Sequence, residues 1–122
     1  MTVYFQAKDA FEADLPTRPL EPPMATPLGG SPIDTRSRVI FNSEDDAIKV
    51  GLWECQPGES RWEFDRHGEF VHILAGKMTV RRDGEPPVVL ASGDSAVFPP
   101  GWTGVWEVHE QLRKIFLVFG PR

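Results

Sequence analysis

Short hydrophobic runs recur along the chain from Arg38 onward, and the polar positions between them are rich in glycine, proline and aspartate. The runs contain mainly Val, Ile, Phe and Trp and return roughly every eight to twelve residues, which is typical of strands separated by turns. No segment in this part keeps a helical spacing of apolar residues. The pattern therefore predicts an all-β region with strands at 38–41, 47–54, 61–64, 69–75, 78–82, 88–90, 95–98, 104–108 and 113–119.

The residues before this region follow a different pattern. Half of the twelve prolines lie in the first 32 residues. Each proline fixes φ and removes a backbone donor, so we expect an extended N-terminal arm over residues 1–37 and a barrel domain over 38–122. The arm would lie over the domain or over a neighbouring subunit, and a disordered tail is the alternative. Its apolar residues are Tyr4, Phe5, Phe11, Leu15 and Leu20.

Length and composition narrow the class of protein. The chain has 122 residues, of which 40% are hydrophobic and 25% charged, and it fits one globular domain. No apolar run is long enough to span a bilayer, the first twenty residues lack the features of a secretory signal, and Cys55 has no cysteine partner. We therefore expect a cytoplasmic protein with no membrane contact. The net charge of -5 argues against nucleic acid as a partner.

An all-β domain of this size avoids open sheet edges by forming a sandwich or a closed barrel, and strand spacing alone does not decide between them. Two segments do. Pro57-Gly58, followed by Glu69 and Gly76 in EFVHILAGKMTV, resembles the first sequence motif of the cupin superfamily, and GDSAVFPPG resembles the start of the second. The resemblance covers about residues 51–119.

Within that superfamily the chain looks like the small single-domain cupins related to ethanolamine-utilisation and ureidoglycine-aminohydrolase proteins. The resemblance implies a double-stranded β-helix, which is a jelly-roll barrel, and such barrels often pair. We therefore expect a homodimer, since a small barrel buries a limited core and the arm supplies Tyr4, Phe5 and Phe11 to cover another surface.

The resemblance also implies that the usual metal site has been lost. Cupins with a metal usually hold it with two histidines and a glutamate from the first motif and one histidine from the second. Glu69 matches the glutamate, but the second-motif histidine corresponds to Gly104. We therefore expect no metal and no cofactor at this site. The two first-motif histidines correspond to Glu63 and Asp65 or, under the other permitted spacing, to Trp62 and Phe64.

Strand alternation favours an aromatic cavity in place of that site. Neighbouring side chains of a strand point to opposite faces, and the apolar pair Trp62 and Phe64 should point inward. The same rule places Trp106 inward with the position of Gly104. Trp62, Phe64 and Trp106 are therefore candidate ligand-binding residues, and simple packing of the barrel core is the alternative.

Glu69 is the candidate catalytic residue. A carboxylate among aromatic rings loses hydration, so it could move a proton or anchor a ligand cation. The alternative is a retained structural residue that is hydrogen-bonded to a tryptophan or to the backbone. For Lys114, pairing with Glu69 or Glu107 is one possibility, and an ion pair at the sheet surface is the favoured one. Cys55 is predicted to be a small buried apolar residue.

These residues favour a small cupin that binds or transforms a small metabolite in its barrel, and the resemblance implies that the metabolite is a nitrogenous one. Two alternatives stay open. One is a non-catalytic binding or accessory module whose barrel is filled by its own aromatic side chains. The other is a metal-dependent enzyme with a rearranged ligand set of Glu63, Asp65, Glu69 and a histidine. His67 is expected in an exposed turn, and His72 is expected to be a packed or interface residue on the opposite strand face from Glu69.

Overall fold

The predicted alternation takes the form of one curled antiparallel sheet. The computed structural model describes residues 1–12 and 14–121, apart from the side chains of Phe11 and Glu12. In chain order, the elements are α1 (Ala7–Glu12), β1 (Thr17–Pro19), β2 (Thr26–Pro27), β3 (Asp34–Asn42), β4 (Ile48–Cys55), β5 (Gly58–Glu63), β6 (Gly68–Arg82), β7 (Val88–Ala91), β8 (Ser95–Phe98) and β9 (Thr103–Phe119).

Two long strands, β6 and β9, organise the sheet. They pair with each other along almost their whole length, with register shifts between Ile73 and Met78. The sequence predicts each of them as two shorter strands, and Gly76 explains why β6 continues instead. Its φ is +90°, and a Cβ there would lie 2.2 Å from the carbonyl oxygen of Gln111. Glycine thus lets the two backbones cross closely at the bend without ending either strand.

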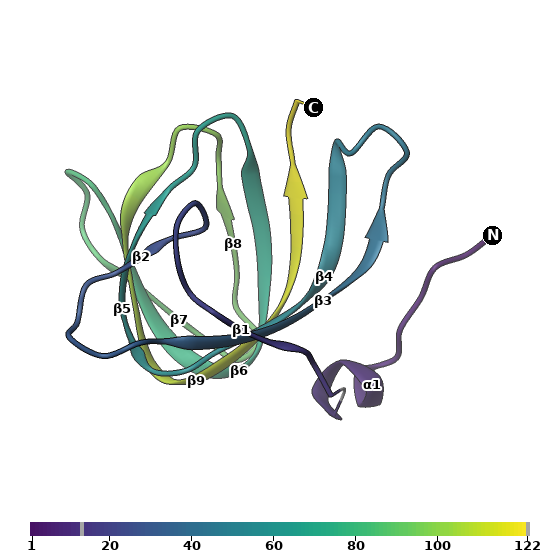
Figure 1. Cartoon of the computed structure of the whole chain (residues 1–122), viewed down its shortest axis with the longest axis horizontal. Helices are drawn as coiled ribbons and strands as arrows, with labels where there is room; N and C mark the ends of the chain where they lie inside the picture. The colour runs from purple at the N-terminus through teal and green to yellow at the C-terminus, as the bar shows by residue number, and fades with distance from the viewer. Residues whose placement is uncertain (13, 122) are drawn as a thin grey trace.

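The other strands are added to this crossed pair. The C-terminal half of β9 also pairs with β4, and its N-terminal half pairs with β5. The sheet order is β1-β3-β4-β9-β5-β2, while β6 additionally pairs with β7 and β8. Figure 1 shows how the sheet curls so that β3 and β4 rise opposite β5 and β8. The all-β, jelly-roll prediction is confirmed.

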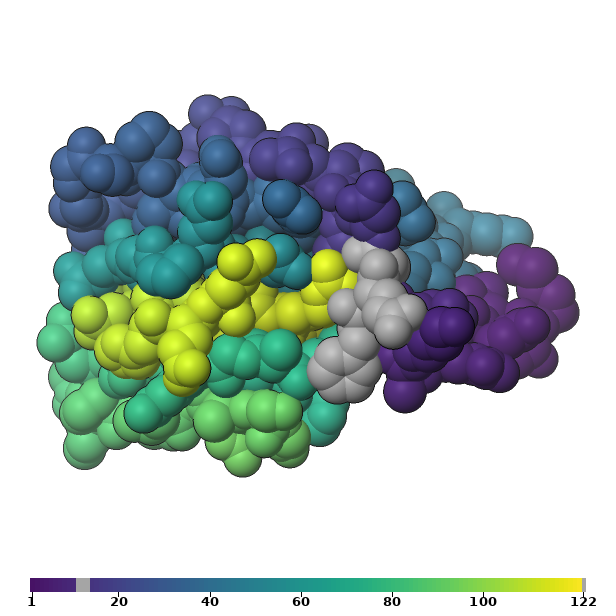
Figure 2. Space-filling model, turned by 90° about the horizontal axis from the view of Figure 1, so that it is seen from below, coloured from purple at the N-terminus to yellow at the C-terminus, as the bar shows by residue number. Residues whose placement is uncertain are grey.

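The N-terminal arm lies over its own domain. β1 pairs with β3 and β2 pairs with β5, so parts of the arm extend the sheet. Leu15 and Leu20 are buried. The expectation of an extended strap is wrong for α1, because Ala7–Glu12 contains good helix formers and precedes the first proline. Figure 2 shows the first residues at one end of the molecule. The side chain of Phe11 lies outside the described residues.

Each face of the sheet has its own core. The inner cluster contains the four tryptophans, together with Phe98 and other buried residues. On the outer face, Ala10 and Leu15 of the arm pack against Leu52, and Phe5 packs beside them. Phe5 is therefore used within its own chain. α1, the helix in the described part of the chain, is far too short to cross a membrane.

Candidate functional site

A cavity of about 590 Å³ lies inside the curled sheet. Trp62 and Phe64, which alternation places inward, line it together with Glu69. The opposite wall comes from β4 and β9, where Trp53 and Lys114 face the cavity. On β9 the inward residues alternate, since Lys114, Phe116 and Val118 all line this space.

Glu69 and Lys114 form a buried ion pair inside the barrel. Lys114 Nζ donates a hydrogen bond to Glu69 Oε2 at 3.0 Å. The two side chains are only 2% and 7% exposed for Lys114 and Glu69 respectively. Of the arrangements considered for Lys114, the pair with Glu69 is the one found, and the favoured ion pair at the sheet surface is wrong. Glu69 therefore does not stand alone among the aromatic rings.

Three indole rings also lie near the ammonium group. Lys114 Nζ lies 4.4 Å from the ring centroids of both Trp53 and Trp106, and 5.8 Å from that of Trp62. These distances are within the range of cation–π attraction. Burial lowers the pKa of Lys114 below its ordinary value, and the charge of Glu69 partly opposes that shift. The site thus holds a compensated but poorly hydrated amine.

Trp106 packs against the residues of this site without lining the cavity. Its ring stacks on Trp62 with centroids 3.8 Å apart, and the residue is 1% exposed. Trp106 is not among the residues that line the cavity, so it touches the ammonium without facing the open space. Trp62 Nε1 donates to Ser60 Oγ at 2.9 Å. Trp106 Nε1 is buried without a hydrogen-bond partner in the described part of the chain.

The position of the second-motif histidine has no room for a side chain. A Cβ on Gly104 would lie 2.3 Å from the carbonyl oxygen of Arg81 and 2.6 Å from the ring of Trp102. Trp62 lies opposite Gly104 in the pairing of β5 with β9. Aromatic packing therefore occupies the region in which the resemblance placed an imidazole ligand. With Lys114 bound to the remaining glutamate, these residues do not fit the usual metal centre.

The rearranged ligand set is not assembled either. Within residues 1–12 and 14–121, no group of three or more His, Cys, Asp or Glu side chains could hold a metal ion. Glu63 and Asp65 are exposed and line the outer part of the cavity. The two histidines outside the cavity have other partners: His72 Nδ1 lies 2.8 Å from Ser95 Oγ, and His109 Nε2 lies 2.7 Å from Thr79 Oγ1.

The cavity mouth contains residues that the sequence did not single out. Arg18 of the arm and Lys49 of β4 line both this cavity and an adjoining one of about 580 Å³. His67, expected in an exposed turn, is exposed and lines both. Alternation in β4 would have placed Lys49 and Trp53 on one face. No local signal identifies Arg18, because its position depends on the pairing of β1 with β3.

Cys55 lies on the inner side of β4, close to this site. It is buried, as predicted, and burial raises the pKa of the thiol to about 12, with Lys114 opposing the shift. The thiolate is the reactive form of cysteine, so a thiol with such a raised pKa is a poor nucleophile. Cys55 therefore acts as an apolar residue of the barrel wall.

A jelly-roll barrel with the first-motif glutamate on its inner face defines the class of the protein as a cupin. Residues 42–116 match the family described as the EutQ-like cupin domain, and the chain belongs to that family. The resemblance stated from the sequence is confirmed. No curated protein matches the chain in sequence.

Solved structures agree with this assignment. A putative ethanolamine utilization protein Q from Salmonella typhimurium is 15% identical, with a TM-score of 0.63 over 90% of this chain and 100% of that one. A DUF861 family protein of unknown function from Pseudomonas syringae is 19% identical, with a TM-score of 0.75 over 88% of this chain and 45% of that one. At these identities the likeness shows the fold alone.

A third structure is closer in sequence. A DUF861 family protein from Thermotoga maritima is 34% identical, with a TM-score of 0.50 over 53% of this chain and 73% of that one. None of these likenesses defines a specific reaction. The function has to be argued from the residues in the cavity.

Proposed function

We propose that this cupin binds a small nitrogenous metabolite in its barrel and that Glu69 transfers a proton to or from it. The observation that carries the proposal is the Lys114–Glu69 pair, which lines a cavity of about 590 Å³. That volume lies within the range of about 300 to 1,000 Å³ usual for small-molecule sites. A cavity with apolar walls and a few converging polar groups is the usual form of such a site.

The polar groups suit a ligand that carries nitrogen. In the described part of the chain, Lys114 is the hydrogen-bond partner of the Glu69 side chain, which leaves Oε1 able to accept from an N–H group. The faces of Trp62 and Phe64 would pack against the rest of the ligand. Arg18 and Lys49 at the mouth would attract an anionic group of the same molecule.

Thermal-shift screening tests this proposal. The full-length protein is screened against small amines, amides and ureido acids, and we expect a compound that raises the melting temperature. The increase should be lost in Glu69→Gln and kept in the matched control Glu107→Gln, whose side chain is exposed on β9. Stabilisation that is equal in both variants would remove Glu69 from the binding site.

A non-catalytic binding or accessory module is the second candidate, and the packing of the aromatic rings favours it. Phe64 and Phe98 stack with centroids 5.7 Å apart, while Trp62 stacks on Trp106. These rings belong to the inner core of the barrel or pack against it. Under this candidate, a ligand that binds is recovered unchanged after prolonged incubation. Conversion of the ligand by the wild type but not by Glu69→Gln would exclude it.

We also propose that the protein is a cytoplasmic homodimer. A row of apolar side chains crosses the outer face of five strands, from Val97 through Phe70, Leu117 and Val50 to Phe41. Val97, Phe70 and Phe41 are 57%, 39% and 38% exposed. The arm covers a neighbouring part of this face and leaves the row open. A continuous apolar row that is exposed at three of its five positions supports covering by a second copy.

Light scattering tests the dimer. We expect a dimer at tens of micromolar, and we expect Phe70→Glu to give a monomer because it places a charge in the middle of the row. Val88→Glu is the matched control, since Val88 is also exposed but lies on β7, outside the row. A wild-type monomer at that concentration would contradict the proposal.

A further inference from the structure

We propose that Lys114 forms a Schiff base with a small aldehyde or ketone that enters the barrel cavity, and that Glu69 moves the protons. This inference rests on the proposed small-molecule function and names the reactive group of the ligand. It assigns a covalent role to a residue that neither the family match nor the structural likenesses single out.

The placement of Lys114 distinguishes it from the other lysines. The chain contains Lys8, Lys49, Lys77 and Lys114. The first three are exposed, whereas Lys114 is 2% exposed and lines the cavity. An amine at the wall of a cavity can meet a bound carbonyl carbon in a fixed orientation, which an exposed lysine cannot provide.

A purely structural ion pair would be a poor use of this position. Two charges removed from water recover little more than their desolvation cost, and an apolar pair of similar size usually serves stability as well. The preceding residue, Arg113, already makes a well-satisfied ion pair on the outer face of the same strand. Lys114 instead makes one hydrogen bond among the described residues, and it lines the cavity.

The protonation state of the amine also suits this role. A Schiff base requires the neutral amine as nucleophile. Burial lowers the pKa of Lys114, so more of it is neutral near pH 7 than of an exposed lysine. Glu69 Oε2 lies 3.0 Å from Nζ, within reach for direct proton transfer.

The step balances without another reactant. Glu69 first takes one proton from the ammonium group, and the free Nζ lone pair attacks the carbonyl carbon. A second proton moves from nitrogen to the former carbonyl oxygen, which gives a carbinolamine. Glu69 then returns its proton to this hydroxyl, the carbon–oxygen bond breaks and water leaves. The products are a protonated imine on Lys114, ionised Glu69 and one water molecule.

The surroundings that hold the ammonium would also hold the imine. The protonated imine keeps one positive charge at the same nitrogen, so the carboxylate of Glu69 remains its counter-ion. The rings of Trp53 and Trp106, each 4.4 Å from Nζ, continue to face that charge. The same rings keep bulk water away from the carbon–nitrogen double bond.

Reductive trapping on the wild-type protein tests the proposal directly. The full chain is incubated near pH 7 with propanal or with pyruvate, each together with cyanoborohydride, and the modified lysine is located by peptide mass spectrometry. The neutral and the anionic probe test whether Arg18 and Lys49 favour an anionic carbonyl compound. We expect at least one probe to modify Lys114 at lower concentration than it modifies Lys8, Lys49 or Lys77.

Two variants test whether trapping at Lys114 depends on proton transfer by Glu69. Glu69→Gln should slow trapping at Lys114 by roughly a hundredfold, the lower end of the usual effect of a general acid–base group. Lys77→Arg, at an exposed position, should leave it unchanged. Modification spread over the exposed lysines with Lys114 unmodified by both probes would overturn the inference. In that case a thermal shift that depends on Glu69 would still support the proposed function, so the two can fail separately.

Discussion

Arg113 and Lys114 are neighbours on β9, and each forms an ion pair on a different face of the sheet. Arg113 points outward and pairs with Glu54 of β4, whereas Lys114 points inward and pairs with Glu69 of β6. The comparison isolates the effect of surroundings, because both cations belong to the same strand. It separates a charged pair that other groups of the protein complete from one that lines a cavity.

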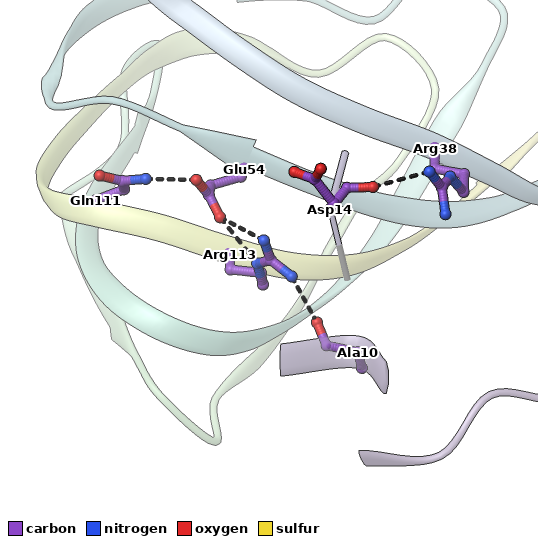
Figure 3. A network of polar contacts seen from close by, with 6 residues as sticks. All are labelled: Ala10, Asp14, Arg38, Glu54, Gln111 and Arg113. Carbon is purple, nitrogen blue, oxygen red and sulfur yellow. Dashed lines mark hydrogen bonds and ion pairs between the residues drawn. The ribbon is translucent and has the colours of Figure 1, made fainter. Parts of the chain in front are cut away.

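The outer pair is completed by the protein itself. Arg113 donates to Glu54 Oε2 through Nε at 2.9 Å and through Nη2 at 2.7 Å. Its Nη1 donates to the carbonyl oxygen of Ala10 at 2.9 Å, and Gln111 donates to the other oxygen of Glu54. Figure 3 shows this network between β4, β9 and α1. Its geometry ties the arm to the sheet.

The inner pair is less complete. Lys114 and Glu69 share one hydrogen bond, and aromatic rings supply the remaining contacts of the ammonium. The cavity beside it has about 590 Å³, whereas the pocket lined by Glu54 has about 100 Å³. Unused hydrogen-bonding capacity next to open space is what a binding site requires, so the inner pair is the functional one in our proposal.

The largest expected effect comes from removing the inner cation. Lys114→Met leaves Glu69 buried without a counter-charge, and the free energy of unfolding should fall by about 3–5 kcal/mol. Urea denaturation measures this loss. The double variant Lys114→Met/Glu69→Leu replaces both charges by apolar groups and should recover most of the stability. A double variant no more stable than Lys114→Met would contradict our account of the pair.

The second expected effect is on the outer pair. Arg113→Met removes hydrogen bonds to a charged partner and should lower the free energy of unfolding by about 1.5–3 kcal/mol. It also frees the carbonyl of Ala10, so limited proteolysis should cut the N-terminal segment faster than in the wild type. Arg113→Lys keeps the positive charge, so its free energy of unfolding should lie between those of the wild type and Arg113→Met. The rate of reductive trapping at Lys114 should stay unchanged in Arg113→Met. Loss of trapping in that variant would show that the outer ion pair also acts on the inner site.

Most of the fold could be predicted because its signal is local. Alternation within short runs marks the strands, and the glycine and proline motifs identify the jelly roll. Prediction from the sequence failed where the pairing between distant strands determines where a strand begins and ends. β6 and β9 are continuous only because they cross at Gly76, and β1 and β2 are strands because β3 and β5 are beside them.

The lining of the cavity at the candidate site was predictable to a similar extent. Glu69, Trp62 and Phe64 follow from the first motif and from alternation, and they line the cavity. The sequence favoured a surface ion pair for Lys114 over its partner Glu69, because Lys114 is 45 residues away from Glu69 and opposes Ile73 in the register of β6 with β9. Trp106 alternates inward as expected, but Trp62 stacks over it and separates it from the cavity. Which of the two rings faces the cavity depends on side-chain packing, which strand alternation alone does not predict.

The smallest expected effect is a pH dependence of the free energy of unfolding, and it tests whether water is excluded from the inner face of the sheet. The thiol of Cys55 has its pKa raised from 9.0 to about 12 by burial. The protonated thiol therefore favours the folded state below pH 9, and this contribution is lost as pH rises toward 12, since only the unfolded thiol ionises there. By pH 10 the loss should be about 1.4 kcal/mol.

Urea denaturation between pH 8 and pH 10 should show this loss as a steeper decline in the free energy of unfolding for the wild type than for Cys55→Ala. Parallel declines would mean that water reaches this wall of the barrel, and the contrast between the inner and outer faces would be weaker than the two ion pairs suggest.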